Sequence, residues 1–436
     1  PNDIPTSVTV LLHEIGHMFS SYHTNYGCDS ENSCERYEPG QGTSIMSTGA
    51  NCDAGDLFAS RTDYFGIGSL QSMMNFTATG TVPFGDPTCS SGVSGGWTDC
   101  STSTASGNAM PSANANANTI NGLTIPHSTP FTLSGTGSDA DGLGSLTYNW
   151  EQYDTDYAGS AAPDDTGAST VAPIFRSFPP SMSNERTCPQ LSSVLAGNVT
   201  TGTGEILPTV ARTLTWRLVV RDNTAGAGGI ACDQISLNVG ADGPFQITSQ
   251  NTTSAWLVGS AQTVTWDVAN TNLAAYTCAS VDILYSSDGG TTFGTTLAMG
   301  VVNDGSQAIT APGVATTMGR IKIVCSGATN IFFDINNVDI AVVAGCTAEA
   351  GTIANSAGVT APEGDSSLNL NLVAGNLITM NAGTLDAGDP DTGLNIESAT
   401  AGVCAYFGGN VPKYESIEFV ISDNTGYTFT PVGNGY

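Results

Sequence analysis

Apolar residues recur at helical spacing most clearly near the start of the chain. Within residues 1–24 the apolar face is formed by Val8, Val10, Leu11, Leu12, Ile15, Met18 and Phe19. Thr6 and Ser7 precede this face and provide hydroxyl groups that can cap a helix. The spacing predicts one amphipathic helix here, followed by a turn-rich stretch to about residue 80 with a short helix near 67–74.

From about residue 119 the period of the pattern changes to two, and β-branched and aromatic residues dominate. The clearest strands are expected at 131–133, 146–150, 213–220, 262–266, 281–285 and 320–324. Ser287-Asp288-Gly289-Gly290 has the composition of a hairpin turn. A Thr-x-Thr-Trp strand occurs twice, at 213–216 and 263–266. This repetition predicts two related sandwich modules whose cores hold Trp150, Trp216 and Trp266.

The sequence therefore predicts a mainly β protein, in which tandem β-sandwich modules follow a helical first segment at 1–80. Residues 81–118 are rich in Gly, Ser, Thr and Asn and are expected to be a linker. The sandwich modules, of immunoglobulin, fibronectin or polycystic-kidney-disease type, are expected at 119–242 and 243–345, and a third β-rich module at 346–436.

The charge balance excludes two classes of partner. Lys plus Arg is 10 and Asp plus Glu is 39, which gives a net charge of −29. Nucleic acids and anionic membrane surfaces are bound by clustered basic residues, so neither is an expected partner. No apolar run approaches the roughly 18–20 residues of a membrane span, so we expect no membrane insertion.

Eleven cysteines are spread along the chain without a Cys-x-x-Cys pair. This pattern is typical of disulfides in an oxidising compartment, so we expect a secreted or cell-surface protein. The simplest pairing, within modules and within the linker, is Cys89–Cys100, Cys188–Cys232, Cys278–Cys325 and Cys346–Cys404. Cys28, Cys34 and Cys52 remain, of which Cys28–Cys34 is favoured by its short loop.

Three of the four histidines fall within eleven residues, at His13, His17 and His23. On a helix His13 and His17 lie one turn apart on the same face, as two ligands of one zinc ion require. Glu14 is then placed to take a proton from zinc-bound water, and His23 can complete three nitrogen ligands after the helix turns. A fourth position left open is the mark of a catalytic zinc site.

These residues resemble the signature of the metzincin zinc metallopeptidases, H-E-x-x-H-x-x-G-x-x-H followed by a methionine turn. The turn is matched by Ser44-Ile45-Met46-Ser47. The segment is more closely similar to the reprolysin-like enzymes of large secreted bacterial proteins, since it has His23-Thr24, Cys28, the run from Glu38 to Met46, and Cys52.

The resemblance implies that residues 1–80 are the C-terminal part of an α/β catalytic domain that cleaves protein or peptide substrates. It implies His13, His17 and His23 as zinc ligands, Glu14 as general base and Met46 as the floor of the site. Ser20 stands where the family has glycine. Only twelve residues precede His13, so we expect a missing front half, a cysteine whose partner lies upstream of Pro1, and an exposed apolar helix face.

Two further hypotheses concern the sandwich modules. Asp139, Asp141 and Asp222 lie in loops with oxygen ligands of the kind that Ca²⁺ prefers, as in polycystic-kidney-disease-like and cadherin-like modules; an ordinary Asx turn is the alternative. Sandwich edge strands can also pair between chains. The alternative to a secreted zinc endopeptidase is therefore an extracellular structural, adhesive or filament-forming protein that self-associates or binds cell-surface partners and carries an incomplete or inactive protease segment.

Overall fold

The computed structural model describes residues 6–26, 36–48, 61–79, 105–142, 144–155, 164–197, 204–327, 330–344, 378–379 and 405–406. The chain divides into two compact units, Pro1–Val342 and Val343–Tyr436. In the second unit the structure describes residues 343–344 and two short strands, β20 (Ile378–Thr379) and β21 (Ala405–Tyr406), which pair in parallel. The described part of the chain is mainly β with few helices, and none of those helices is long and apolar enough to cross a membrane.

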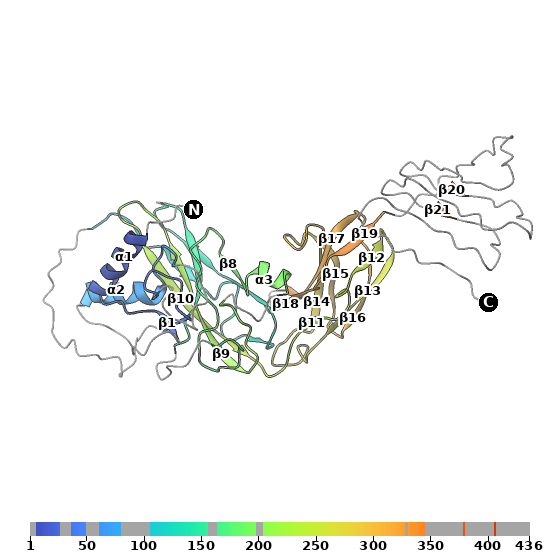
Figure 1. Cartoon of the computed structure of the whole chain (residues 1–436), viewed down its shortest axis with the longest axis horizontal. Helices are drawn as coiled ribbons and strands as arrows, with labels where there is room; N and C mark the ends of the chain where they lie inside the picture. Colours follow the sequence, from blue (N-terminus) through green and yellow to red (C-terminus); the bar gives the residue numbers. More distant parts are fainter. Residues whose placement is uncertain are drawn as a thin grey trace, which may run out of the picture. The chain divides into compact units, whose positions relative to one another are not determined.

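The first 80 residues, here called the helical segment, contain two long helices and a small two-stranded sheet (Figure 1). The elements are α1 (Thr6–Met18), β1 (Asn25–Tyr26), β2 (Glu38–Pro39) and α2 (Ile67–Thr79). β1 and β2 pair in parallel, and the Phe19 and Phe76 rings meet edge to face 6.5 Å apart. Both sequence-predicted helices are confirmed, and α2 runs five residues beyond its expected end.

The first sandwich is built around a four-stranded sheet with the order β4-β10-β9-β7, and β3–β6 and β5–β8 form two further strand pairs. Its elements are β3 (Ser112–Asn114), β4 (Thr124–Ile125), β5 (Phe131–Ser134), β6 (Thr136–Ser138), β7 (Thr147–Gln152), β8 (Glu185–Cys188), α3 (Leu191–Leu195), β9 (Arg212–Arg221) and β10 (Ile230–Val239). The linker assignment was wrong at its end, because β3 belongs to this module and Ala115 is fully buried. The Ala115 N–H donates to the Asp233 carboxylate, which fixes this polar stretch on the sheet.

The second sandwich packs a three-stranded sheet against a six-stranded one. The first sheet has the order β11-β13-β16; the second has the order β12-β19-β17-β14-β15, with β18 also paired to β17. The strands are β11 (Gln246–Ile247), β12 (Ser254–Leu257), β13 (Ala261–Asp267), β14 (Ser280–Ser286), β15 (Thr295–Val302), β16 (Ser306–Thr310), β17 (Thr316–Cys325), β18 (Phe333–Ile335) and β19 (Ile340–Val343). All six strands predicted from the sequence, in both sandwiches, are confirmed, and no observed end differs from its predicted end by more than four residues.

One apolar core runs through both sandwiches, from Ala115 to Val342. Trp150, Trp216 and Trp266 lie in it, each no more than 4 % exposed, as the alternation predicts. Backbone bonds also join the modules, since the Thr132 N–H donates to the Ile331 carbonyl at 3.0 Å. The two sandwiches are therefore continuous in both core and backbone hydrogen bonding.

Candidate metal centre

Three histidine Nε2 atoms converge on one point beside α1. His13 and His17 lie one turn apart on the helix, and His23 returns to them from the chain that follows. The Nε2 atom of His13 lies 3.1 Å from that of His17 and 3.1 Å from that of His23, and the last two are 3.2 Å apart. His13 is buried, His23 is half-buried and His17 is exposed, so the cluster opens to solvent on one side.

Backbone carbonyls determine which nitrogen of two of these rings carries the proton. The Nδ1 atom of His13 lies 2.7 Å from the Ile45 carbonyl oxygen, and that of His17 lies 2.8 Å from the Ser21 carbonyl oxygen. A carbonyl oxygen can only accept, so both Nδ1 atoms donate and the Nε2 lone pairs remain available in the neutral rings. Burial lowers the pKa of His13 to about 4, which keeps that ring neutral at neutral pH.

The cluster fits a zinc ion. Three nitrogens with edges of 3.1, 3.1 and 3.2 Å form a nearly equilateral triangle. Its centre lies roughly 1.8 Å from each nitrogen, slightly less than the usual Zn–N distance of about 2.0–2.1 Å. These three nitrogens would hold the ion, and the cluster is open to solvent on the side of the exposed His17. Lone pairs of two neutral rings facing each other at 3.1 Å repel unless a cation lies between them, so the donor set itself favours a metal.

The end of α1 brings His23 back to the helix. The Ser21 N–H donates to the Gly16 carbonyl and the Ser20 N–H to the His17 carbonyl, both at 3.0 Å, which is the Schellman pattern of a helix C-terminus. Ser20 has a φ of +67°, in the left-handed region that glycine usually occupies. The backbone thus adopts a left-handed turn with a serine at the position that glycine usually occupies.

Met46 packs against α1 between the two helical histidines. Its side chain is fully buried, and a Cβ atom added at Gly16 would overlap its sulfur. The same Cβ would lie 3.2 Å from the Phe65 ring. Gly16, between the two histidines on α1, is therefore required for close packing over Met46 and Phe65, a role that the sequence alone did not assign.

Glu38 is a second residue whose role sequence reasoning missed. It is 1 % exposed and accepts hydrogen bonds from the Thr43 and Ser44 N–H groups, both 3.1 Å from Oε1. The hydroxyl groups of Thr24, Thr43 and Ser44 donate to the same carboxylate. Because Thr24 follows His23 and Ser44 lies two residues before Met46, this buried carboxylate connects the third histidine to the methionine turn.

Two charged side chains, Glu14 and Arg61, interact electrostatically near the cluster. Glu14 is exposed on α1, next to His13. Burial lowers the pKa of the Arg61 guanidinium, and the nearby Glu14 carboxylate raises it. The positive charge of Arg61 also contributes to lowering the pKa of His13. A carboxylate and a guanidinium that interact electrostatically thus lie near the cluster.

The three aspartates of the proposed calcium site lie near one another without forming a metal-ligand cluster in the described residues. Asp222 accepts N–H groups on both oxygens, at 2.7 Å from the Asn108 amide and 2.8 Å from the Gly229 backbone. Asp141 accepts the Ala109 N–H at 2.6 Å. Burial is the largest cause of the raised pKa of Asp139, and the negative charge of Asp141 is the second. Asp141 and Asp222 thus accept hydrogen bonds from neighbouring segments of the same sandwich, and calcium binding stays a prediction.

The cysteine predictions have mixed outcomes. Cys278 and Cys325 form a disulfide, as predicted. The pair Cys188–Cys232 was wrong, since both cysteines are free. Cys188 is buried in the core, whereas Cys232 is exposed on the face of β10 opposite the core residue Leu237. The pairs Cys28–Cys34, Cys89–Cys100 and Cys346–Cys404, together with Cys52, lie outside the described residues.

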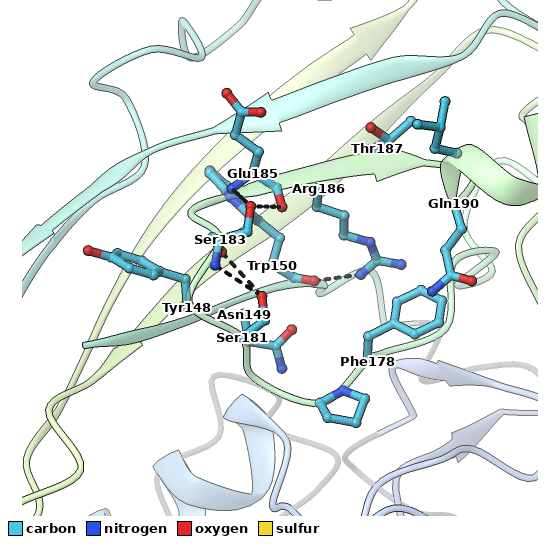
Figure 2. A pocket seen from close by; sticks show the side chains of 12 residues that line it. Tyr148, Asn149, Trp150, Phe178, Ser181, Ser183, Glu185, Arg186, Thr187 and Gln190 are labelled. Carbon is cyan, nitrogen blue, oxygen red and sulfur yellow. Dashed lines mark hydrogen bonds between the residues drawn. The ribbon is translucent and has the colours of Figure 1, made fainter. Parts of the chain in front are cut away.

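A separate cavity of about 280 Å³ lies on the first sandwich (Figure 2). It is lined by β7, β8 and the chain between them, with the Phe178 ring beneath the Arg186 guanidinium, whose carbon lies 4.9 Å from the ring centre. Arg186 donates to the Trp150 carbonyl and pairs with Glu205 at 3.0 Å. Its charge is therefore neutralised within the sandwich, and none of the lining residues belongs to the helical segment.

Comparison with known proteins identifies no family. No protein-family model matches the chain, and no curated protein does. Solved structures that match include a chimeric titin Z1Z2–Z1Z2 tandem carrying a fibronectin GRGDS peptide, 12 % identical over 51 % of this chain and 95 % of that one, with a TM-score of 0.18. Fibronectin(III)-like modules of CbhA from Clostridium thermocellum are 10 % identical over 54 % and 95 %, with a TM-score of 0.18. Drosophila N-cadherin EC1-3 is 12 % identical over 54 % and 68 %, with a TM-score of 0.19. At such scores the fold assignment rests on this chain's own strand pairing.

Proposed function

We propose that this protein is a secreted zinc endopeptidase that hydrolyses peptide bonds in protein substrates. The observation that carries the proposal is the convergence of three histidine Nε2 atoms within 3.2 Å of one another, with two tautomers fixed by backbone carbonyls. When bound, zinc supplies a Lewis acid that polarises a substrate carbonyl and activates water. The resemblance of residues 13–46 to the metzincin signature supports the same reaction class.

Glu14 is the proton carrier in this proposal. Glu14 is exposed and follows the proposed ligand His13 in the chain; in this proposal its carboxylate accepts a proton from the attacking water and returns it to the leaving amine. Arg61 lies close enough to Glu14 for the two side chains to interact electrostatically. His13, buried and neutral, stays a ligand throughout.

An adhesive or filament-forming role is the second candidate, and the β15 strand favours it. β15 is the terminal strand of its sheet and carries no charged residue over Thr295–Val302. Met299 and Val302 are 71 % and 67 % exposed. An uncharged apolar edge is suited to pairing with a strand of another chain. Loss of self-association in Met299→Lys, measured by sedimentation velocity, would support this role; a monomeric wild type would exclude it.

Metal analysis with point variants tests the endopeptidase proposal. We expect about one zinc per wild-type chain, little in His17→Ala, and full zinc without casein hydrolysis in Glu14→Gln. His127→Ala is the matched control, because His127 is the fourth histidine and bonds to Ser128 and Asp242 in the sandwich. A wild type without zinc, or a Glu14→Gln variant as active as the wild type, would refute the proposal.

A further inference from the structure

The outer face of the β7–β9 strand pair is buried although strand alternation directs it away from the sandwich core. Leu218 and Val220 of β9 point into the core, so Arg217, Val219 and Arg221 point outward. Val219 is nevertheless fully buried. Glu151 on β7 pairs with Arg217 in the strand register and is also 0 % exposed. We call Glu151, Arg217, Val219 and Arg221 the supporting face.

The helical segment covers the supporting face, with α2 beside this sheet (Figure 1). The Ile67 N–H at the start of α2 donates to Glu151 Oε2 at 2.9 Å. Arg221 Nη2 donates to the Phe65 carbonyl at 3.0 Å, and Arg217 Nη1 to Gln71 Oε1 at 2.7 Å. A carboxyl oxygen at the first N–H groups of a helix satisfies a donor that has no partner within the helix.

Residues 64–67 connect these contacts to the first histidine. The Tyr64 carbonyl accepts the Ile45 N–H at 2.9 Å, and the Ile45 carbonyl accepts the His13 Nδ1–H at 2.7 Å. The Phe65 ring packs against Gly16, between the two helical histidines. A shift of residues 64–67 would therefore move both the carbonyl that orients His13 and the ring beneath α1.

A second set of contacts leads to the third histidine. The Tyr37 ring lies 5.3 Å from the Tyr153 ring of the sandwich. The Tyr37 and Glu38 N–H groups donate to the Thr24 carbonyl at 3.1 and 2.9 Å, directly after His23. The sandwich thus contacts the supports of His13 and of His23 through different side chains.

We propose that Glu151 and Arg221 are positioning residues of the metal centre, so that the first sandwich sets the zinc affinity of histidines more than a hundred residues earlier in the chain. The inference rests on the proposed zinc site. Neither residue touches the metal; both hold residues 65–67, through which the orientation of His13 and the position of α1 are maintained. Groups that hydrogen-bond a metal ligand directly typically change metal affinity by about 10–100-fold; Glu151 and Arg221 act one step further out, so we expect the lower end of that range.

Zinc affinity of the full chain, measured by competition with a chromophoric chelator, tests the proposal. We expect Glu151→Ala and Arg221→Met to bind zinc about tenfold more weakly than the wild type. Glu151→Gln keeps an oxygen that accepts the Ile67 N–H and should restore near wild-type affinity. Glu205→Ala is the matched control, because Glu205 is a 1 % exposed carboxylate of the same sandwich that accepts the Gln190 N–H at 2.8 Å and pairs with Arg186.

The outcomes separate the two proposals. Absence of zinc binding by the wild type would refute the metal centre itself. Wild-type binding with unchanged affinity in Glu151→Ala and Arg221→Met would refute the positioning role alone. An equal loss in Glu205→Ala would also refute it, because general loosening of the sandwich would then explain the effect. If Glu151→Ala does not fold, Arg221→Met provides the test, because Glu151 still accepts the Ile67 N–H in that variant.

Discussion

Replacing Gly16 with alanine should destabilise the helical segment, the reverse of the usual effect of this change in a helix. In an exposed helix interior, Gly→Ala stabilises by about 0.5–1 kcal/mol because the unfolded glycine has more freedom to lose. At Gly16 the new Cβ would overlap the Met46 sulfur and lie 3.1 Å from its terminal methyl group. Met46 is 0 % exposed, so its side chain moves only by disturbing its neighbours.

The two contributions oppose each other, and the packing contribution is larger. Extra carbon in a filled core costs typically about 1–3 kcal/mol, from which the helix propensity gain is subtracted. We expect Gly16→Ala to lower the free energy of unfolding by about 1–2 kcal/mol. Urea unfolding followed by the helical circular dichroism band is the assay, because the two long described helices both belong to the helical segment.

A double-mutant cycle distinguishes packing from any other cause. Met46→Ala removes the side chain that the new Cβ would meet, at a cost of about 2–5 kcal/mol for the cavity. In that background Gly16→Ala should become stabilising, by up to about 1 kcal/mol. Val10→Ala, at a 45 % exposed position of α1, is the control and should be neutral or slightly stabilising. Stabilisation by Gly16→Ala in the wild-type background would refute the packing argument.

Three further changes have defined outcomes. Ser20→Gly should raise the free energy of unfolding by about 1 kcal/mol, since Ser20 has a φ of +67°; a loss of stability in urea unfolding would contradict this. Burial raises the pKa of Glu151 from 4.5 to about 7, so the folded protein holds a proton that the unfolded chain releases. The stabilisation is complete below about pH 4.5, and the free energy of unfolding should fall by up to roughly 3 kcal/mol as the pH rises through 7. Urea unfolding followed by tryptophan fluorescence measures this dependence, which should be flatter in Glu151→Gln. Replacing Cys278 and Cys325 together by alanine opens a loop of 47 residues. This change should cost up to about 4 kcal/mol, and a thermal midpoint equal to that of the wild type would exclude a stabilising bond.

The parts of the centre that the sequence predicted are those fixed by local geometry. His13 and His17 lie on one helix face because a separation of four residues is about one turn. His23 joins them through a turn only a few residues long, which Ser20 permits by adopting a left-handed conformation. The strands were also readable, because alternation with period two marks a buried face within each of them.

Contacts between distant segments were not readable in this way. Glu151 lies 84 residues from Ile67, and Arg221 lies 156 residues from Phe65. No spacing rule relates such pairs. The wrong prediction of a Cys188–Cys232 disulfide is a different case, because the alternation of side chains along β10 could have excluded it. Cys232 is an odd number of residues from Leu237, so the two side chains lie on opposite faces of the strand.

The supporting face shows why alternation alone is an incomplete guide to function. Polar residues at every second position of a strand indicate which face points away from the core, and such a face is usually solvated. The chain has only ten Lys and Arg residues in total, so two arginines on one strand face are a large share of its positive charge. Arg217 and Arg221 both donate to the helical segment, beside a fully buried Glu151. An uncharged outer face would have left the Phe65 carbonyl and the Ile67 N–H without these partners, at about 1–3 kcal/mol for each unsatisfied group. The outward charges of the first sandwich are therefore part of the structure that holds the helical segment, which is why substitutions on this module test how the histidine cluster is positioned.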